Sequence, residues 1–168
     1  MCSLTQDICI GSRRAAEPVY IPITYKALST KKVLAICVGL QILFSNSEEG
    51  KKTGINFFKG KIKKLSSIKC KEPIPHVGYN SISLKNKEKY LSKIFQKDFY
   101  FTHSYVAEKK SLEKNFNGNY GLTRYGDTEF LSFIKHQNIF ATQFHPEKSG
   151  EAGLNLLKYF YEEKKNNI

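Results

Sequence analysis

The segment from Val33 to Phe44 constrains the fold of this chain more than any other stretch. Residues 33–37 are apolar without interruption, as expected for a strand that is buried on both faces. Gly39 marks a sharp turn, and apolar residues then recur at helical spacing from Leu40 onward. A buried strand that is followed so closely by a helix predicts an α/β layered domain.

The rest of the chain adds further strands and two more helices. Aromatic and β-branched residues predict strands at Ile62–Leu65, Gly78–Leu84, Phe99–Val106, Tyr120–Tyr125, Glu129–Ile134 and Ile139–Phe144. A short helix is predicted over Glu88–Phe95, and a longer one follows Ser149, a fitting N-cap, and ends near Lys164-Lys165. Residues 31–165 are therefore predicted to form one domain.

Residues 1–30 carry a different pattern and stay outside the predicted domain. Apart from Val19–Ile23 they show neither helical nor strand periodicity, and Pro18 and Pro22 confine that short stretch to an edge strand or a loop. The sequence predicts no buried strand ahead of Gly11.

The length, the longest apolar run and the cysteines of the chain indicate which class of protein it belongs to. The 168 residues suit one domain with a real core, and the longest apolar run is far too short to cross a bilayer. The first residues lack the basic start and apolar stretch of a signal peptide. The four cysteines form no CxxC pair and no zinc-ligand spacing, so the sequence predicts free thiols, no metal site and a cytoplasmic location.

The charge of the chain is strongly basic, with a formal net charge of +12. Residues 51–71 contain eight lysines and no acid, which suits either a patch for phosphates or an acidic partner, or a solvated hairpin. Arginine is scarce and no nucleic-acid-binding motif accompanies the lysines, so we favour the solvated hairpin and expect no nucleic-acid partner.

Cys37 stands at the predicted junction of strand and helix. A nucleophile on such an elbow needs small residues two positions before and after it, and Ala35 and Gly39 occupy these positions. The turn lifts the thiol to a helix N-terminus, which favours the thiolate, and directs the Val38 N–H toward a developing oxyanion. The competing interpretation is that Cys37 is a small buried apolar residue, as most free cysteines are.

The second candidate for chemistry is His145-Pro146-Glu147. Proline forces His145 into extended geometry, in which residues two apart project to the same side. His145 and Glu147 therefore form the base-and-orienter half of a catalytic triad. A lone histidine is more often structural, and we interpret His136 in that way.

These motifs make a family resemblance visible. The stretches AICVGLQ (35–41) and QFHPEKS (143–149) resemble the class I, triad-type glutamine amidotransferases. The stretches PHVGYN (75–80), YFTHSY (100–105) and SGEAGL (149–154) are similar to the glutaminase subunits of imidazole glycerol phosphate synthase, and paralogues that feed other acceptors share them.

The resemblance implies a role for each matching residue. Cys37 is the implied nucleophile, His145 the general base and acid, and Glu147 the residue that orients the imidazole. The implied glutamine-binding residues are Gln41, Val38, Ser104 and Tyr105. The implied partner-facing residues are Tyr79, Tyr100 and Lys148. Tyr79 stands where the family usually has tryptophan, so an aromatic anchor is kept with a smaller ring, and we expect weakened docking. For His76 and His103 we expect structural roles.

The resemblance also implies a reaction and a partner. The thiolate attacks the side-chain amide of glutamine, His145 protonates the departing ammonia, and water then hydrolyses the thioester to glutamate. The ammonia passes to a (β/α)8-barrel synthase subunit in a heterodimer, which forms imidazole glycerol phosphate in histidine biosynthesis. No metal or organic cofactor is implied for this subunit.

The family's N-terminal elements do not match residues 1–30. These elements include a Pro-Gly-Val-Gly-type loop that provides a second oxyanion donor. We therefore expect an N-terminally incomplete domain, with an exposed sheet edge and turnover lowered about 10²–10³-fold.

Other functions stay open at this point. They are a paralogous glutaminase that feeds another acceptor such as a surface sugar, a truncated and catalytically weak or inactive copy, a non-catalytic binding protein and, last, a basic nucleic-acid binder.

Overall fold

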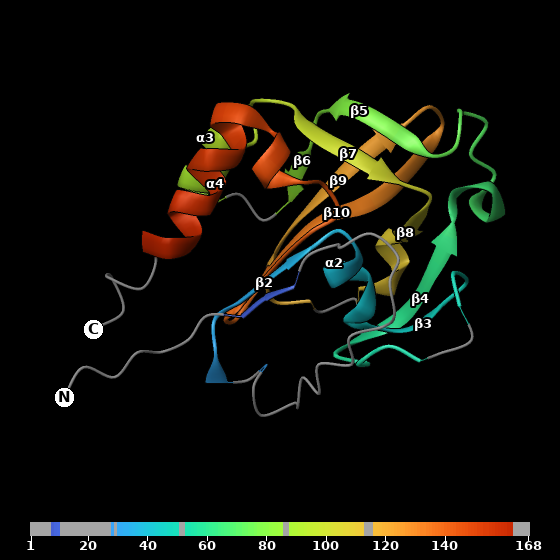
Figure 1. Cartoon of the computed structure of the whole chain (residues 1–168), viewed down its shortest axis with the longest axis horizontal. Coiled ribbons are helices and arrows are strands. Elements are labelled where there is room, and N and C mark those ends of the chain that lie inside the picture. The colour runs from blue at the N-terminus through green and yellow to red at the C-terminus, as the bar shows by residue number, and fades with distance from the viewer. Residues whose placement is uncertain are drawn as a thin grey trace.

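The computed structural model (Figure 1) describes residues 8–10, 28, 30–50, 53–85, 88–112 and 116–162, and of residues 8–10 the backbone only. Within these residues one mixed sheet contains β1 (Ile8–Ile10), β2 (Val33–Ile36), β3 (Phe44–Ser47), β4 (Phe58–Lys64), β6 (Ser83–Lys85), β8 (Tyr105–Ala107), β9 (Asn119–Tyr125), β10 (Thr128–His136) and β11 (Ile139–Thr142). A separate two-stranded ribbon, the β5–β7 ribbon, consists of β5 (His76–Asn80) and β7 (Phe99–His103). The described α-helices are α2 (Val38–Ile42), α3 (Lys89–Ile94) and α4 (Gly150–Glu162).

Strand β2 lies between two parallel neighbours, β1 and β11. All four of its side chains are buried, as its unbroken apolar pattern predicts. Ala35 of β2 stands opposite Ile10 of β1 and Ala141 of β11, so the carboxyl ends of the three strands meet at one edge of the sheet. Cys37 follows β2 at that edge, which is where parallel sheets carry their functional residues.

Strand β10 connects this parallel part to an antiparallel part. It pairs with β9 along one side, and with β11 and β8 along the other. Beyond β8 the sheet continues to β4 and then to β3, which runs parallel to β4. The long β10 therefore holds β11, and the segment that follows β11, next to β8.

Two apolar clusters cover opposite faces of the sheet. Alternate side chains of β2 divide between them, because successive residues of a strand point to opposite faces. Leu34 and Ile36 join the cluster that also contains residues of α3, α4 and β7, whereas Val33 and Ala35 join the cluster with residues of α2, β3 and β4. Figure 1 shows α3 and α4 side by side at one end of the molecule.

Replacing the fully buried Phe133 of β10 by alanine is expected to destabilise the fold by about 3–5 kcal/mol, because it removes apolar contacts and leaves a cavity. Urea denaturation followed by circular dichroism measures the loss. Leu154→Ala on the exposed face of α4 is the matched control, with an expected change within about 0.5 kcal/mol. Equal midpoints for the two variants contradict this assignment of the core.

The α/β layered fold is confirmed, but two strands differ from the prediction. A strand, β1, precedes Gly11 and pairs with β2, so the expectation of no strand at this place is wrong. Helix α2 ends at Ile42, and Phe44–Ser47 forms β3 instead of continuing the helix. In both cases pairing with a neighbouring strand overrides a weak local pattern.

Two predicted strands are each divided in the structure. The segment Gly78–Leu84 contributes to β5 and β6, and the segment Phe99–Val106 contributes to β7 and β8. In each case the first part belongs to the β5–β7 ribbon and the second part to the large sheet. A bend at Ser104 separates β7 from β8, and there the chain passes from the β5–β7 ribbon into the large sheet.

The two predicted helices are present as α3 and α4. Ser149 precedes α4, but its hydroxyl donates a hydrogen bond to the His145 carbonyl at 2.6 Å instead of capping the helix. Lys164 and Lys165, and the stretch Val19–Ile23, lie outside the described residues. None of the described helices has the length and apolar character that a membrane crossing requires.

Candidate active site

Cys37 occupies a strained elbow between β2 and α2. Its backbone has φ 54° and ψ −105°, a region that residues with a side chain rarely adopt. The Cys37 N–H donates to the Thr142 carbonyl of β11 at 2.6 Å, which holds the elbow against the neighbouring strand. The thiol is 8% exposed, so the elbow predicted from the sequence is present and largely enclosed.

Burial is the main influence on the Cys37 thiol, and it raises the pKa from 9.0 to about 11. The negative charges of Glu49 and Glu147 raise the pKa further. The Val38 backbone N–H and the Gln143 side chain act in the opposite direction, because each donates a hydrogen bond to sulfur. The thiol is therefore protonated at neutral pH in this structure, and the reaction requires a base.

Because of this raised pKa, the rate at which iodoacetamide alkylates Cys37 is expected to keep rising with pH through the range in which an ordinary thiol, with a pKa near 8.5, has already reached its plateau. Peptide mass spectrometry across a pH series measures the rate at each cysteine separately. A plateau for Cys37 at or below the ordinary thiol pKa contradicts the buried environment described here.

His145 has the tautomer that a general base needs. Its Nδ1 lies 2.7 Å from the Glu147 Oε1, and since a carboxylate only accepts, Nδ1 carries the proton. Nε2 is then the basic nitrogen, and it is buried with no hydrogen-bond partner among the described residues. The backbone is fixed as well, because the His145 N–H donates to the Tyr100 carbonyl at 2.8 Å.

The fold brings Cys37 and His145 to the same edge of the sheet. They follow β2 and β11, which are adjacent and parallel. Glu147 is close enough to influence the thiol electrostatically. In this state the sulfur makes its side-chain hydrogen bond with Gln143, at 3.6 Å, and none with His145. Apo enzymes often show such loose geometry before substrate binds.

A cavity of about 380 Å³ opens beside the elbow. This volume lies within the range of small-molecule sites (~300–1,000 Å³). Its lining includes Val38, Gln41 and Glu49. Glu49 is not among the residues predicted from the sequence; it follows β3, and its charge acts on the Cys37 thiol.

Of the four residues predicted to bind glutamine, Gln41 and Tyr105 meet directly. The Gln41 Nε2 donates to the Tyr105 carbonyl at 2.9 Å and to the Gln143 Oε1 at 3.1 Å. Val38 lines the same cavity as Gln41. Ser104 lies at the bend before Tyr105, and its carbonyl accepts from the Leu65 N–H at 2.9 Å.

The three predicted partner-facing residues meet at the surface of the molecule. The Tyr79 hydroxyl donates to the Lys148 carbonyl at 3.0 Å. The Tyr79 and Tyr100 rings pack edge to face at 5.5 Å, and the Lys148 Nζ lies 5.8 Å from the centre of the Tyr100 ring. Tyr79 is 63% exposed and its neighbour Val77 on the same strand is 55% exposed, which is unusual for apolar side chains of this size.

Two further histidines are buried below the β5–β7 ribbon. His76 Nδ1 and His103 Nε2 lie 3.1 Å apart, and His76 stacks on Phe101 and Tyr125. Burial lowers the pKa of His76 to about 4 and that of His103 to about 3, so both rings are neutral. Their enclosed positions agree with the structural roles expected for them.

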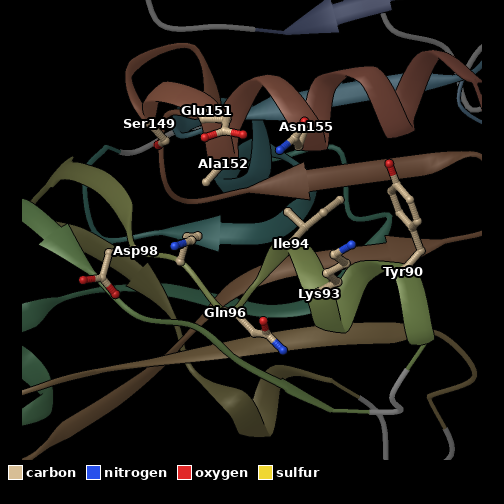
Figure 2. Close-up of a pocket in the computed structure, with 10 residues that line it drawn as sticks. Tyr90, Lys93, Ile94, Gln96, Asp98, Ser149, Glu151, Ala152 and Asn155 are labelled. Carbon is tan, nitrogen blue, oxygen red and sulfur yellow. The ribbon is translucent and has the colours of Figure 1, made fainter.

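A larger cavity, of about 660 Å³, lies between α3 and α4 (Figure 2). Its rim carries both signs of charge, with Lys93 and Lys97 against Asp98 and Glu151. None of the residues assigned to the active site from the sequence lines it. Among the described residues no cluster of histidine, cysteine, aspartate and glutamate side chains could hold a metal ion.

The lysine-rich segment is exposed along β4. Lys61 and Lys63 lie 3.7 Å and 4.0 Å from the Glu48 carboxylate, which also accepts the Lys64 N–H. These contacts fit the solvated surface favoured from the sequence. Lys51 and Lys52 lie outside the described residues.

Comparison with known proteins identifies similar chains. The glutamine amidotransferase class-I family model matches residues 11–163. The chain is 45% identical over 134 residues to the imidazole glycerol phosphate synthase subunit HisH of Caldanaerobacter subterraneus, covering 79% of this chain and 62% of that relative. It is 36% identical over 155 residues to the HisH subunit of Methanosarcina barkeri, covering 90% of this chain and 73% of that relative.

A solved structure supports the fold independently. A protein described as a glutamine amidotransferase matches 82% of this chain and 64% of its own length, with a TM-score of 0.52 and 14% identity. At that identity the likeness concerns the fold alone.

Proposed function

The chain belongs to the class-I glutamine amidotransferase family, and from this premise we propose that it hydrolyses glutamine to glutamate and ammonia as the glutaminase subunit of an imidazole glycerol phosphate synthase. The chain spans 62% of the length of the Caldanaerobacter relative. The observation that carries it is that an elbow cysteine and a buried histidine, whose basic Nε2 has no partner among the described residues, follow two adjacent parallel strands.

The proposed reaction begins with proton transfer from the Cys37 thiol to the His145 Nε2. The sulfur then attacks the amide carbon of glutamine, and the oxyanion that forms is stabilised by the Val38 N–H. His145 returns the proton to the leaving ammonia, which gives a γ-glutamyl thioester. Water, deprotonated by His145, attacks the thioester and releases glutamate and the thiol.

The cavity next to the elbow provides complementary groups for glutamine. The Glu49 carboxylate suits the α-ammonium group of the substrate, and the Gln41 Oε1, left as an acceptor because the Gln41 Nε2 donates to Tyr105 and Gln143, suits a substrate N–H. Gln41 is held by Tyr105 and Gln143, so the protein itself sets the orientation of this side chain. Preorganisation of this kind lowers the entropic cost of binding.

The exposed cluster of Val77, Tyr79, Tyr100 and Lys148 suits a protein partner. Exposed aromatic side chains that are fixed by neighbours are typical anchors of interfaces. We assign this surface to a barrel-type cyclase subunit that uses the ammonia, in a heterodimer. A cytoplasmic location is part of this proposal, and the two described cysteines, Cys37 and Cys70, are free thiols.

The test is a steady-state assay of glutamate production by the purified chain, alone and with a candidate cyclase subunit, with formation of imidazole glycerol phosphate followed in parallel. Glutamine-dependent product in the mixture supports the proposal. Glutamate production without any product formed by the cyclase indicates a glutaminase with a different acceptor. No glutamate production in either condition overturns the proposed activity.

Tyr79→Ala is expected to weaken binding of the cyclase about 10- to 30-fold, because it removes an exposed aromatic anchor at the centre of this cluster. Titration calorimetry or a surface-binding assay measures the affinity. Leu154→Ala on α4, where Leu154 is 65% exposed, is the matched control and should bind as the unaltered chain does. If both variants lose the same affinity for the cyclase, the interface does not lie at this cluster.

A further inference from the structure

Gln143 is fully buried between β11 and the His145 turn, and its side chain connects two residues of the active site. Its Nε2 lies 3.6 Å from the Cys37 sulfur. Its Oε1 accepts a hydrogen bond from the Gln41 Nε2 at 3.1 Å. The Gln143 backbone is fixed at the same time, because its N–H donates to the Ser132 carbonyl at 2.9 Å.

The direction of these hydrogen bonds follows from chemistry. The Tyr105 carbonyl can only accept, so the Gln41 atom 2.9 Å away from it must be the amide nitrogen. That same nitrogen lies 3.1 Å from Gln143 and must face its oxygen. The other end of the Gln143 amide, its NH₂ group, therefore faces the Cys37 sulfur.

The hydrogen bonds of the two buried histidines, His76 and His103, agree with this assignment of donors and acceptors. His103 Nδ1 lies 3.1 Å from the Tyr105 carbonyl, so it carries the proton of the neutral ring. His103 Nε2 must then accept from the His76 Nδ1. The Tyr105 carbonyl thus accepts hydrogen bonds from the Gln41 Nε2 and the His103 Nδ1. The two bonds hold this carbonyl in place, and the orientation of the Gln41 and Gln143 amides depends on it.

We propose that Gln143 is a positioning residue for Cys37: the side-chain N–H of Gln143 holds the sulfur in place at the elbow and favours the thiolate form. The Gln143 N–H matters because most of the other groups around the sulfur disfavour a negative charge on it. Burial and the Glu49 and Glu147 carboxylates all disfavour a negative sulfur, and the Val38 N–H is the other donor directed at it. The inference rests on the proposed function only in treating the thiolate as the reacting form.

The experiment measures the alkylation rate of Cys37 by iodoacetamide in Gln143→Leu, at one fixed, mildly alkaline pH and then across a pH series. Leucine is close in size but has no donor, so the thiol pKa should rise by about one pH unit. The thiolate fraction then falls tenfold, and the higher nucleophilicity of a more basic thiolate offsets part of that, so alkylation slows about three- to fourfold. Peptide mass spectrometry reads Cys70 in the same sample as an internal reference.

If Gln143 had a structural role alone, its replacement would change the alkylation rate of Cys37 in the opposite direction. If Gln143→Leu merely loosens the fold, Cys37 becomes exposed, its pKa falls toward that of an ordinary thiol, and alkylation accelerates. Gln143→Asn, which shortens the side chain but keeps an amide, is the second variant and should also slow alkylation. Gln96→Leu, at an exposed glutamine of the α3–α4 cavity, should react as the unaltered chain does.

The measurement needs no glutamine, so its outcome is independent of the proposed activity. Slower Cys37 alkylation in both Gln143 variants supports the inference even if no glutaminase activity is found. Unchanged or faster alkylation overturns it, even in a chain that hydrolyses glutamine.

Discussion

Cys37→Ala is expected to lower glutamine hydrolysis by at least about 10⁴-fold, because the covalent step has no alternative nucleophile at the elbow. The fold should be retained, since alanine is small and apolar. Glutamate release in a coupled assay measures the loss. The control is Cys70→Ala, which removes the other free thiol of the described residues at a position outside the site and should leave turnover unchanged.

The same variant separates hydrolysis from use of the ammonia. With the cyclase subunit present, Cys37→Ala should still support product formation from added ammonium salts while losing the glutamine-dependent reaction. Turnover of glutamine by Cys37→Ala at the unaltered rate contradicts the assignment of the nucleophile.

His145→Asn is expected to lower turnover about 10²–10⁴-fold, because asparagine can occupy the place of the ring and cannot take up a proton. The effect should fall on kcat more than on KM, since His145 does not line the cavity next to the elbow. The matched control is His136→Asn. His136 bonds to the Asn117 carbonyl at 3.0 Å, far along β10 from the active-site edge, and its replacement should leave kcat unchanged.

A pH profile adds a second criterion for His145. Loss of the base should remove the dependence of kcat on the neutral imidazole and make the rate rise with hydroxide concentration instead. If His145→Asn keeps the pH profile of the unaltered chain and loses as much activity as His136→Asn does, the loss of activity is due to a change in the fold and not to removal of the base.

The active-site edge could be predicted from the sequence because its determinants are local. Small residues on both sides of Cys37 require a tight elbow, and proline after His145 requires an extended backbone. Both features appear in the structure, at φ 54° for Cys37 and in the extended His145 backbone before the turn. Neither depends on knowing which strands are neighbours.

The layers around the edge depend on distant residues and could not be predicted in this way. The segments 78–84 and 99–106 each read as one strand, because hydrophobic pattern does not reveal a change of sheet. The strands β1 and β3 are three and four residues long, too short to show a period of their own. Their existence follows from the parallel pairing that β2 and β4 offer.

Two residues with roles proposed from the structure could not be predicted from the sequence, for a similar reason. Glu49 lies in a polar stretch with no motif, and its electrostatic influence on the thiol depends on the path of the chain after β3. Gln143 was visible within a family motif, but its role depends on the position of Gln41, a hundred residues earlier in the chain. A contact between two amides leaves no periodic signal in either segment.

The positive φ angle of Cys37 has a consequence for the evolution of this chain. A residue with a side chain in this conformation stores about 1–3 kcal/mol of strain, which glycine relieves. Cys37→Gly should therefore be an inert protein that melts at a higher temperature than its active parent. Copies of this chain that are no longer selected for catalysis are expected to acquire glycine at position 37, because this change raises thermal stability at the expense of an activity that is no longer required.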